Sequence, residues 1–238
     1  MDKKIEKLRE MIQGSDNIVF FGGAGVSTES GIPDFRSVDG LYRQKYKYPP
    51  EEILSATFFR SHPNEFYDYC REKLFVEGVK PNRAHTRLAE LESEGKLKAI
   101  VTQNIDSLHQ AAGSKNVLEL HGNTHRFYCM DCGKDMPEEN VIAAEKAPRC
   151  ECGGIVRPDV VLYEESLDYK VISDTVNYIS NCDMLIIGGT SLAVYPAAGL
   201  INYYKGDKLV LINRDPTPFD SQAALAINEK IGEVFKQV

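Results

Sequence analysis

The sequence has no tryptophan, only five histidines and no excess of basic side chains. Its 28 Lys and Arg residues are outnumbered by 35 Asp and Glu residues, which gives a net charge of −7 at pH 7. Such a chain has no global positive field to attract nucleic acid or an anionic membrane surface. The composition therefore argues against a nucleic-acid partner, and it suits a protein substrate that carries positive charge.

The sequence also lacks a long apolar run. No stretch reaches the roughly 18 uninterrupted apolar residues that a membrane-spanning helix needs. Residues 1–14 alternate charged and apolar side chains at helical spacing, unlike the apolar block of a secretory signal. We therefore expect a cytoplasmic protein with no membrane partner. The sequence leaves the oligomeric state open, and a monomer is the expectation.

Short, continuous apolar runs alternate with helical segments along the chain. Continuous runs are typical of strands buried on both faces of a parallel sheet. The alternation predicts an α/β fold with a doubly wound, Rossmann-like parallel sheet. Strands are expected at 17–21, 98–102, 117–120, 160–163, 184–187 and 209–212, and helices at 84–94, 168–180, 196–204 and 228–237.

Two insertions interrupt this alternation. Residues 32–80 are rich in aromatic side chains at helical spacing, and residues 123–157 contain a cysteine cluster. We expect a helical module and a zinc-binding module that together form one small domain. The large Rossmann-like domain would then consist of residues 1–31, 81–122 and 158–238.

Four of the six cysteines fall into two pairs, each followed by glycine. Four thiolates suit a closed, tetrahedral zinc site, which is structural because no position is open for water. A redox Cys-x-x-Cys or a disulfide is an alternative that a reducing compartment disfavours. Cys70 and Cys182 have no partner in the sequence and are expected to be buried. The predicted metal ligands are Cys129, Cys132, Cys150 and Cys152.

A glycine-rich stretch, residues 22–25, follows the first apolar run. Small residues there allow a diphosphate to approach backbone N–H groups at a helix start, although a simple tight turn is an equal alternative. Thr28 replaces the third glycine of the dehydrogenase fingerprint, and Tyr42, Arg43 and Gln44 stand where an acid would bind the ribose. Hydride transfer is therefore disfavoured.

His121 differs from the other four histidines in its position. It follows the apolar run 117–120 and precedes Gly122, which places it at the carboxyl edge of a strand, where open α/β sheets bind ligands. An imidazole with an ordinary pKa near about 6.5 is suited to act as a general base near neutral pH. The other histidines are expected to be surface or hydrogen-bonded structural residues.

Longer strings carry a resemblance to a known family. The string GAGVSTESGIPDFR at 23–36 resembles the cofactor-binding signature of the sirtuins, the NAD-dependent protein deacylases. Residues 102–109 resemble the second signature of that family, His121-Gly122 its catalytic histidine, and residues 188–191 and 211–213 its adenosine-side contacts. These matches occur in the family's order, and the pattern is most similar to the compact bacterial and archaeal sirtuins.

The resemblance implies an NAD-dependent protein-lysine deacetylase that releases nicotinamide, free lysine and O-acetyl-ADP-ribose. His121 would remove a proton from a ribose hydroxyl, while Asn104 and Asp106 would orient the nicotinamide ribose and carboxamide. A cap for a strand-to-helix turn is the alternative role of Asn104 or Asp106. Mono-ADP-ribosyl transfer from the same NAD site and a non-catalytic NAD sensor are the alternative functions.

The resemblance also assigns contacts to NAD. The glycine-rich stretch and the second signature would surround the diphosphate and the nicotinamide ribose, and Phe35 would cover the nicotinamide pocket. The residues implied are Gly22, Ala24, Gly25, Thr28, Phe35, Arg36, Gln103, Asn104, Ile105, Asp106, His121, Gly189, Thr190, Ser191, Asn213, Lys230 and Ile231.

A peptide substrate would bind, as in this family, by β-strand addition between two segments, 160–164 and 192–195. Many sirtuins have Phe-Gly-Glu where this chain has Tyr163-Glu164-Glu165, which puts the register of the first segment in doubt. Sirtuins that remove acidic acyl groups have a Tyr-x-x-Arg pair, and Cys70 replaces its arginine here, so neutral acyl groups are expected. The predicted substrate residues are Tyr67, Val160, Val161, Tyr163, Glu164, Leu192, Val194 and Tyr195.

Overall fold

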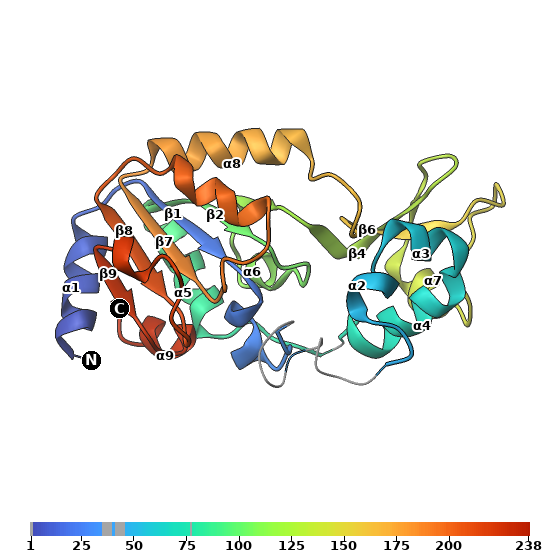
Figure 1. Cartoon of the computed structure of the whole chain (residues 1–238), viewed down its shortest axis with the longest axis horizontal. Coiled ribbons are helices and arrows are strands. Elements are labelled where there is room, and N and C mark those ends of the chain that lie inside the picture. The colour runs from blue at the N-terminus through green and yellow to red at the C-terminus, as the bar shows by residue number, and fades with distance from the viewer. Residues whose placement is uncertain (1, 35–39, 41–45, 77) are drawn as a thin grey trace.

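A computed structural model of the chain describes residues 2–34, 40, 46–76 and 78–238. The described residues form a large body around a six-stranded sheet and a smaller body beside it, joined by several chain segments (Figure 1). Every pairing within the large sheet is parallel. The predicted fold class, a Rossmann-like parallel sheet with a smaller second unit, is confirmed.

The strand order of the large sheet is β3-β2-β1-β7-β8-β9. The chain moves outward in one direction from β1 and in the other direction from β7, so the order reverses between these two neighbours. Ligands of open α/β sheets bind outside the carboxyl ends of the strands at such a reversal. The strands are β1 (Ile18–Gly22), β2 (Leu97–Thr102), β3 (Val117–Glu119), β7 (Met184–Gly188), β8 (Lys208–Ile212) and β9 (Leu225–Ile227).

Both faces of this sheet are covered. In β1, Ile18 and Phe20 pack with α1, α5 and α9, whereas Val19 and Phe21 pack with α8 and η4 on the opposite face. All four side chains are fully buried, which stabilises the fold by roughly 1.5–3 kcal/mol for each large apolar side chain. The covering helices are α1 (Asp2–Gln13), α5 (Arg83–Ser93), α8 (Tyr169–Asn181), the 3-10 helix η4 (Ala197–Tyr203) and α9 (Ile231–Phe235).

Local sequence explains where two of these helices begin. The Asn82 side chain accepts a hydrogen bond from the Ala84 N–H, and the His85 ring reaches back to the Asn82 N–H, which is a capping box at the start of α5. Asp168 accepts a hydrogen bond from the Val171 N–H at the start of α8. The first cap also places the His85 ring next to Ser27, which follows the glycine-rich turn.

The smaller body has its own sheet and its own core. Its antiparallel sheet has the order β5-β4-β6. Aromatic residues of its helices, among them Phe59, Phe66 and Tyr67, pack against Phe127 and Val156 of this sheet. Its elements are α2 (Pro50–Ile53), α3 (Ala56–Ser61), α4 (Pro63–Lys73), β4 (Gly122–Cys129), β5 (Asp135–Met136), α7 (Glu138–Ile142) and β6 (Val156–Val160).

One predicted strand is wrong. The expected strand at 160–163 does not belong to the large sheet, because Val160 ends β6 and pairs antiparallel with Gly122 of β4. The helical segment expected at 196–204 is present as the 3-10 helix η4. The structure also adds β9, which is too short to give a periodic signal.

Three short elements complete the large body. They are the 3-10 helices η1 (Ala24–Val26) and η2 (Thr28–Ser30), which follow β1, and the helix α6 (Leu108–Ala111), which follows β2. A further 3-10 helix, η5 (Asp220–Gln222), lies before β9. Across the described part of the chain, no helix has the length and apolar character needed to cross a membrane.

Candidate active site

The glycine-rich turn after β1 packs backbone to backbone against the turn after β7. The Gly25 N–H donates to the Gly189 carbonyl at 2.8 Å, and the Gly23 N–H donates to the Gly188 carbonyl at 3.2 Å. A Cβ at Gly189, whose φ is +59°, would lie 2.3 Å from the Val26 nitrogen. No side chain fits here, so the two turns form a tight pair at the point where the strand order reverses.

Ser27 connects the two predicted signatures. Its buried hydroxyl donates to Asp106 Oδ2 at 2.6 Å and accepts from Asn104 Nδ2 at 3.0 Å. Asp106 Oδ1 in turn accepts from the Leu108 N–H at 3.0 Å, the first N–H of α6, whose N-cap residue is Ser107. The polar pair at 104 and 106 is therefore held in a fixed orientation beside the glycine-rich turn. The alternative role of Asp106 as the helix cap is not what the structure has, because Ser107 is the N-cap of α6.

The His85 ring lies within hydrogen-bonding distance of Ser27. Its Nε2 lies 3.5 Å from Ser27 Oγ, and its Nδ1 accepts from the Asn82 N–H at 3.2 Å, which places the ring proton on Nε2. Burial lowers the pKa of His85 to about 4, against the opposing attraction of Asp106. The ring is therefore neutral at pH 7 and acts as a fixed hydrogen-bonding group.

Gln103 spans the space between the ends of β2 and β7. Its Oε1 accepts from Thr190 Oγ1 at 2.9 Å, and a Cβ on Gly23 would come within 2.9 Å of the same oxygen. Its Nε2 is buried and has no hydrogen-bond partner among the described residues. A buried unpaired donor is costly, so this amide fits a site that an oxygen-rich ligand completes.

His121 lies between β3 and β4, next to Gln103. Its Nδ1 is 2.9 Å from the Gln103 carbonyl oxygen, and since a carbonyl can only accept, Nδ1 carries the proton and Nε2 keeps its lone pair. Burial lowers the pKa of His121, against the opposing effect of this hydrogen bond. The neutral, oriented imidazole is chemically a general base.

Gly122 holds the chain after His121 in place. Its φ is +77°, and a Cβ there would lie 2.0 Å from the Asp159 carbonyl oxygen. The Val161 N–H donates to the His121 carbonyl at 2.9 Å. The backbone of His121 is thereby tied to the strand that leads out of the smaller body.

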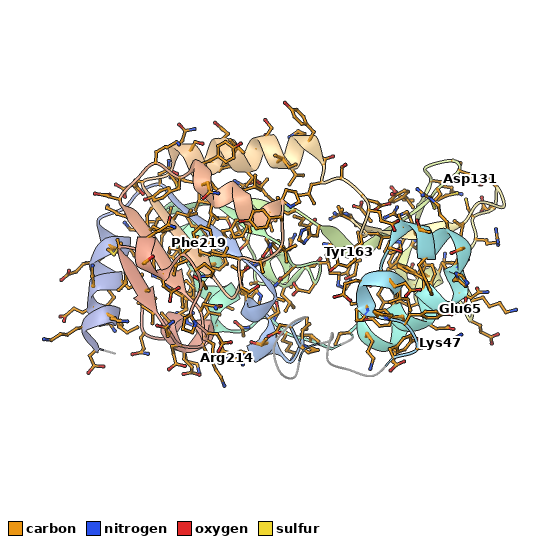
Figure 2. The ribbon with its side chains drawn as sticks, in the orientation of Figure 1. Lys47, Glu65, Asp131, Tyr163, Arg214 and Phe219 are labelled. Atoms are coloured by element: carbon orange, nitrogen blue, oxygen red, sulfur yellow. The ribbon has the colours of Figure 1, made fainter. Side chains whose placement is uncertain are left out.

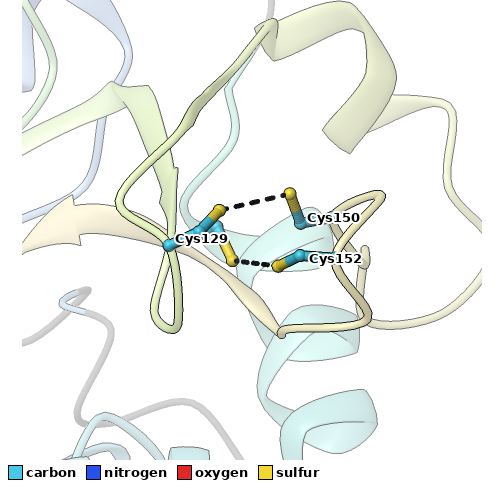
Figure 3. A group of neighbouring side chains, drawn as sticks. Cys129, Cys150 and Cys152 are labelled. Carbon is cyan, nitrogen blue, oxygen red and sulfur yellow. Dashed lines mark hydrogen bonds between the residues drawn. The ribbon is translucent and has the colours of Figure 1, made fainter.

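The four predicted metal ligands converge in the smaller body. Their sulfur atoms all lie within 4.8 Å of one another, with Cys129 3.5 Å from Cys152 and Cys132 3.7 Å from Cys150 (Figure 3). Four thiolates at about 2.3 Å from one tetrahedral zinc ion would be about 3.8 Å apart. The sulfur positions fit a four-thiolate zinc centre.

Electrostatics also favour a cation at this cluster. The Cys132 backbone N–H is the main group that lowers the pKa of Cys129 to about 7. The Gly154 N–H favours the Cys152 thiolate, but hydrogen bonds with Cys129 and Cys132 outweigh it and raise the pKa of Cys152 to about 12. Four adjacent thiols cannot all ionise alone, and a divalent ion supplies the missing positive charge.

Two other predicted NAD residues use their polar groups locally. Thr28 Oγ1 donates to the Gly25 carbonyl at 3.0 Å, and the Ile105 carbonyl accepts from both the N–H and the hydroxyl of Thr124. Ala24 begins η1 directly beside the paired turns. Phe35 and Arg36 lie outside the described residues.

The predicted adenosine-side residues lie at the ends of β7, β8 and α9. Asn213 follows β8, and its Nδ2 donates to the Asp215 carbonyl at 2.6 Å. Ile231 is buried against Gly188, where an added Cβ would lie 2.3 Å from Ile231 Cδ1. Lys230 directly precedes α9, and Ser191, after Thr190, is exposed.

The predicted substrate residues differ in exposure. Tyr163, on the strand-like segment after β6, and Tyr195, after β7, are among the exposed large side chains, at 39% and 69%. Tyr163 lies between the two bodies (Figure 2). Leu192 is buried with a φ of +54°, and its N–H donates to Thr190 Oγ1 at 3.2 Å. Val160, Val161 and Val194 are partly buried.

Tyr67 is placed differently from the expectation of a substrate contact. It is fully buried, and its hydroxyl donates to the Val156 carbonyl at 2.9 Å inside the smaller body. Its one hydrogen-bonding group is therefore occupied, and a contact with an acyl group stays a prediction. Cys70, at the position of the missing arginine, is buried, and Arg71 donates instead to the Lys146 carbonyl.

Sequence reasoning missed Ser27 and the specific place of His85. Ser27 lies inside the first signature, but no spacing rule indicates which of its polar residues points inward. Asn82 followed three residues later by His85 is a recognisable helix start, and this signal could have placed His85 below the turn. Asn123, which donates to Ser107 and Glu119 and joins the second signature to β4, had no signal of its own.

Together, a reversed parallel sheet, paired glycine turns, an oriented imidazole and a four-thiol cluster define a Rossmann-like nucleotide-binding protein with a structural metal centre. The sequence profile of the Sir2 family matches residues 23–196. The chain is 59% identical to an NAD-dependent protein deacetylase of Clostridium acetobutylicum, covering 99% of this chain and 98% of that protein. It is 58% identical to one of Clostridium perfringens, covering 100% and 99%.

Solved structures agree with the sequence comparison. A Sir2 structure with a p53 peptide and NAD+ superimposes with a TM-score of 0.87 at 39% identity, covering 98% of this chain and 96% of that chain. A structure described as concerning the mechanism and regulation of Sir2 enzymes superimposes with a TM-score of 0.90 at 41% identity, covering 100% and 97%. The chain belongs to the Sir2 family, as its two signatures suggested.

Proposed function

We propose that this chain is an NAD-dependent protein-lysine deacetylase that transfers the acetyl group to ADP-ribose. The products are nicotinamide, free lysine and O-acetyl-ADP-ribose. The relatives named as NAD-dependent protein deacetylases and the Sir2 structures with acetylated peptide support this activity. The observation that carries the proposal is the convergence of Ser27, Asn104, Asp106 and His121 on the carboxyl ends of β1 and β2.

His121 is the proposed general base. The Gln103 carbonyl fixes its Nδ1 proton, so Nε2 is free to take a proton from a ribose hydroxyl. Because the pKa of His121 is lowered, the ring is in its basic form at neutral pH. Proton transfer of this kind typically accelerates a reaction by a factor of about 10²–10⁴.

Asn104 and Asp106 are the proposed orienting groups for the nicotinamide end. Ser27 holds both side chains, and the resulting fixed dipoles need no rearrangement as charge develops on the ribose. NAD supplies the electrophilic ribose carbon and the leaving group. The chain's own part is to position that carbon against the acyl oxygen and to exclude water.

NAD is expected to lie over the paired glycine turns. The proposed contacts are Gly22, Ala24, Gly25 and Thr28 on the first turn, Gln103 and Ile105 on the second signature, and Gly189, Thr190 and Ser191 on the third. The unpaired Gln103 Nε2 is suited to a ribose hydroxyl. Phe35, Arg36, Asn213, Lys230 and Ile231 are proposed as further contacts on the basis of the family signatures.

Residues 32–80 and 123–157 are proposed to form the zinc-binding and helical domain; the sheet of the smaller body also includes Gly122 of β4 and residues 158–160 of β6. Zinc held by Cys129, Cys132, Cys150 and Cys152 would cross-link the ends of β4 and β6. Because all four positions are protein thiolates, the ion has a structural role. An acyl-lysine peptide is proposed to bind between 160–164 and 192–195, and the protein is proposed to act in the cytoplasm as a monomer.

The test is a product balance. The zinc-loaded protein is incubated with an acetyl-lysine peptide and NAD, and nicotinamide, freed lysine and O-acetyl-ADP-ribose are each quantified by mass spectrometry. One of each per turnover is expected. A control variant, His125→Ala, should retain activity. It changes an exposed histidine of β4 that pairs with Glu138 of α7. ADP-ribose attached to a protein without freed lysine would overturn the proposal in favour of ADP-ribosyl transfer.

A further inference from the structure

The segment after β6 connects His121 to the helices of the smaller body. At one end, the Val161 N–H donates to the His121 carbonyl at 2.9 Å. At the other end, the Tyr163 N–H donates to the Leu54 carbonyl at 3.0 Å, and the Tyr163 carbonyl accepts from the Ala56 N–H at 3.1 Å. Both backbone groups of Tyr163 are thus committed to the junction of α2 and α3.

Glu164, the next residue, has an unusual backbone. Its φ is +76°, a left-handed conformation that residues with a Cβ adopt rarely and at a cost. Its side chain is held in place: one carboxylate oxygen accepts from the Thr57 N–H at 2.9 Å and from the Thr57 hydroxyl at 2.7 Å. The Thr57 contact offsets the backbone cost and fixes the turn against the first residues of α3.

The side chain of Glu164 is bonded to Thr57, but its main chain is open to a further partner. Among the described residues, neither the N–H nor the carbonyl of Glu164 makes a hydrogen bond, and the residue is exposed. The following residue is also fixed, because Glu165 forms a two-pronged ion pair with the buried Arg157. A rigid, exposed backbone with open hydrogen-bonding groups is the feature that an added β-strand requires.

We propose that Glu164 is a positioning residue for the acyl-lysine peptide, and that its contact with Thr57 holds residues 163–165 so that the open main chain pairs with the peptide backbone. The inference rests on the proposed deacetylase function. Without the contact, the turn would have to be ordered when the peptide binds, which weakens binding without altering the groups around NAD.

The experiment is steady-state kinetics with an acetyl-lysine peptide and NAD on the zinc-loaded protein. Glu164→Ala removes the carboxylate but keeps the Cβ. The KM for the peptide should rise about fivefold, within roughly two- to thirtyfold, the range for loss of a helix-capping contact. The KM for NAD and the kcat should stay within about twofold of the original values, because no NAD-site group changes.

Three further variants separate positioning from general stability. Glu164→Gln keeps an acceptor for Thr57 and should keep the peptide KM near its original value. Thr57→Val removes only the hydroxyl donor and should give a smaller rise than Glu164→Ala. The control, Glu52→Ala, removes an exposed glutamate from α2 of the same body and should change nothing.

An unchanged peptide KM in Glu164→Ala, with an active original protein, would overturn this inference and leave the deacetylase function intact. Equal changes in peptide KM, NAD KM and kcat would also overturn it, because they would show a merely structural role. A thermal midpoint measured for each variant identifies loss of folding. An original protein that frees no lysine would overturn the proposed function, and this inference with it.

Discussion

Acid should destabilise the protein because two histidines are buried next to the candidate active site. The rings of His85 and His109 are in edge contact, with centroids 4.8 Å apart, and both are almost completely buried. Neither ring nitrogen of His109 has a hydrogen-bond partner among the described residues. Burial lowers the pKa of His85 to about 4 and that of His109 to about 3, and the neighbouring His85 lowers the latter further.

The sign of the effect follows from these pKa values. The unfolded chain protonates its histidines near pH 6.5, whereas the folded protein keeps both rings neutral down to pH 3–4. Stability is therefore complete above about pH 6.5 and is lost as the pH falls towards the folded pKa values. At pH 5, which is 1.5 units below the unfolded pKa, each ring lowers the free energy of unfolding by about 2 kcal/mol, and the pair lowers it by about 4 kcal/mol.

The assay is urea unfolding of the zinc-loaded protein at pH 7 and pH 5, compared with His109→Phe. Phenylalanine fills a similar volume and removes both unpaired nitrogens, so the loss between the two pH values should shrink by about 2 kcal/mol relative to the original protein. The control, His62→Phe, makes the same change at an exposed histidine and should leave the loss unaltered. An equal pH dependence in His109→Phe and the original protein would refute the reasoning.

Three further predictions concern the site. Cys129→Ser should abolish the binding of one zinc ion per chain and lower the thermal midpoint by several degrees, and metal analysis showing retained zinc would contradict the proposed centre. Gly189→Ala, which places a Cβ 2.3 Å from the Val26 nitrogen, should raise the KM for NAD at least about tenfold, and a normal KM would show that the paired turns do not contact NAD. Acetyl-lysine peptide should be processed with a kcat/KM at least about tenfold above that for succinyl-lysine peptide, because buried Cys70 offers no positive charge for a carboxylate; equal values would contradict this.

The parallel sheet and the signatures were predictable because they depend on local patterns. Fully buried strands such as β1 and β7 are continuous apolar runs, and the glycines that follow them are required by backbone contact. The cysteine pairs were equally readable, since thiol spacing reports a metal site directly. Their four sulfur atoms lie within 4.8 Å of one another.

Other features depend on contacts that the sequence does not encode locally. The run at 160–163 resembles a buried parallel strand, but Val160 pairs with Gly122 in the antiparallel sheet of the smaller body. Ser27 is one of several polar residues in its string, and only the fold shows that it joins Asn104 to Asp106. The departure at Glu164 put the register of the peptide segment in doubt, and only the fold reveals its contact with Thr57.

The central claim is that an imidazole held by the Gln103 carbonyl performs the proton transfer. The most direct measurement is the rate of O-acetyl-ADP-ribose formation by His121→Ala at saturating peptide and NAD. We predict that this rate falls by about 10²–10⁴ while the thermal midpoint and NAD binding remain close to those of the original protein. Product formation at the original rate would contradict the account.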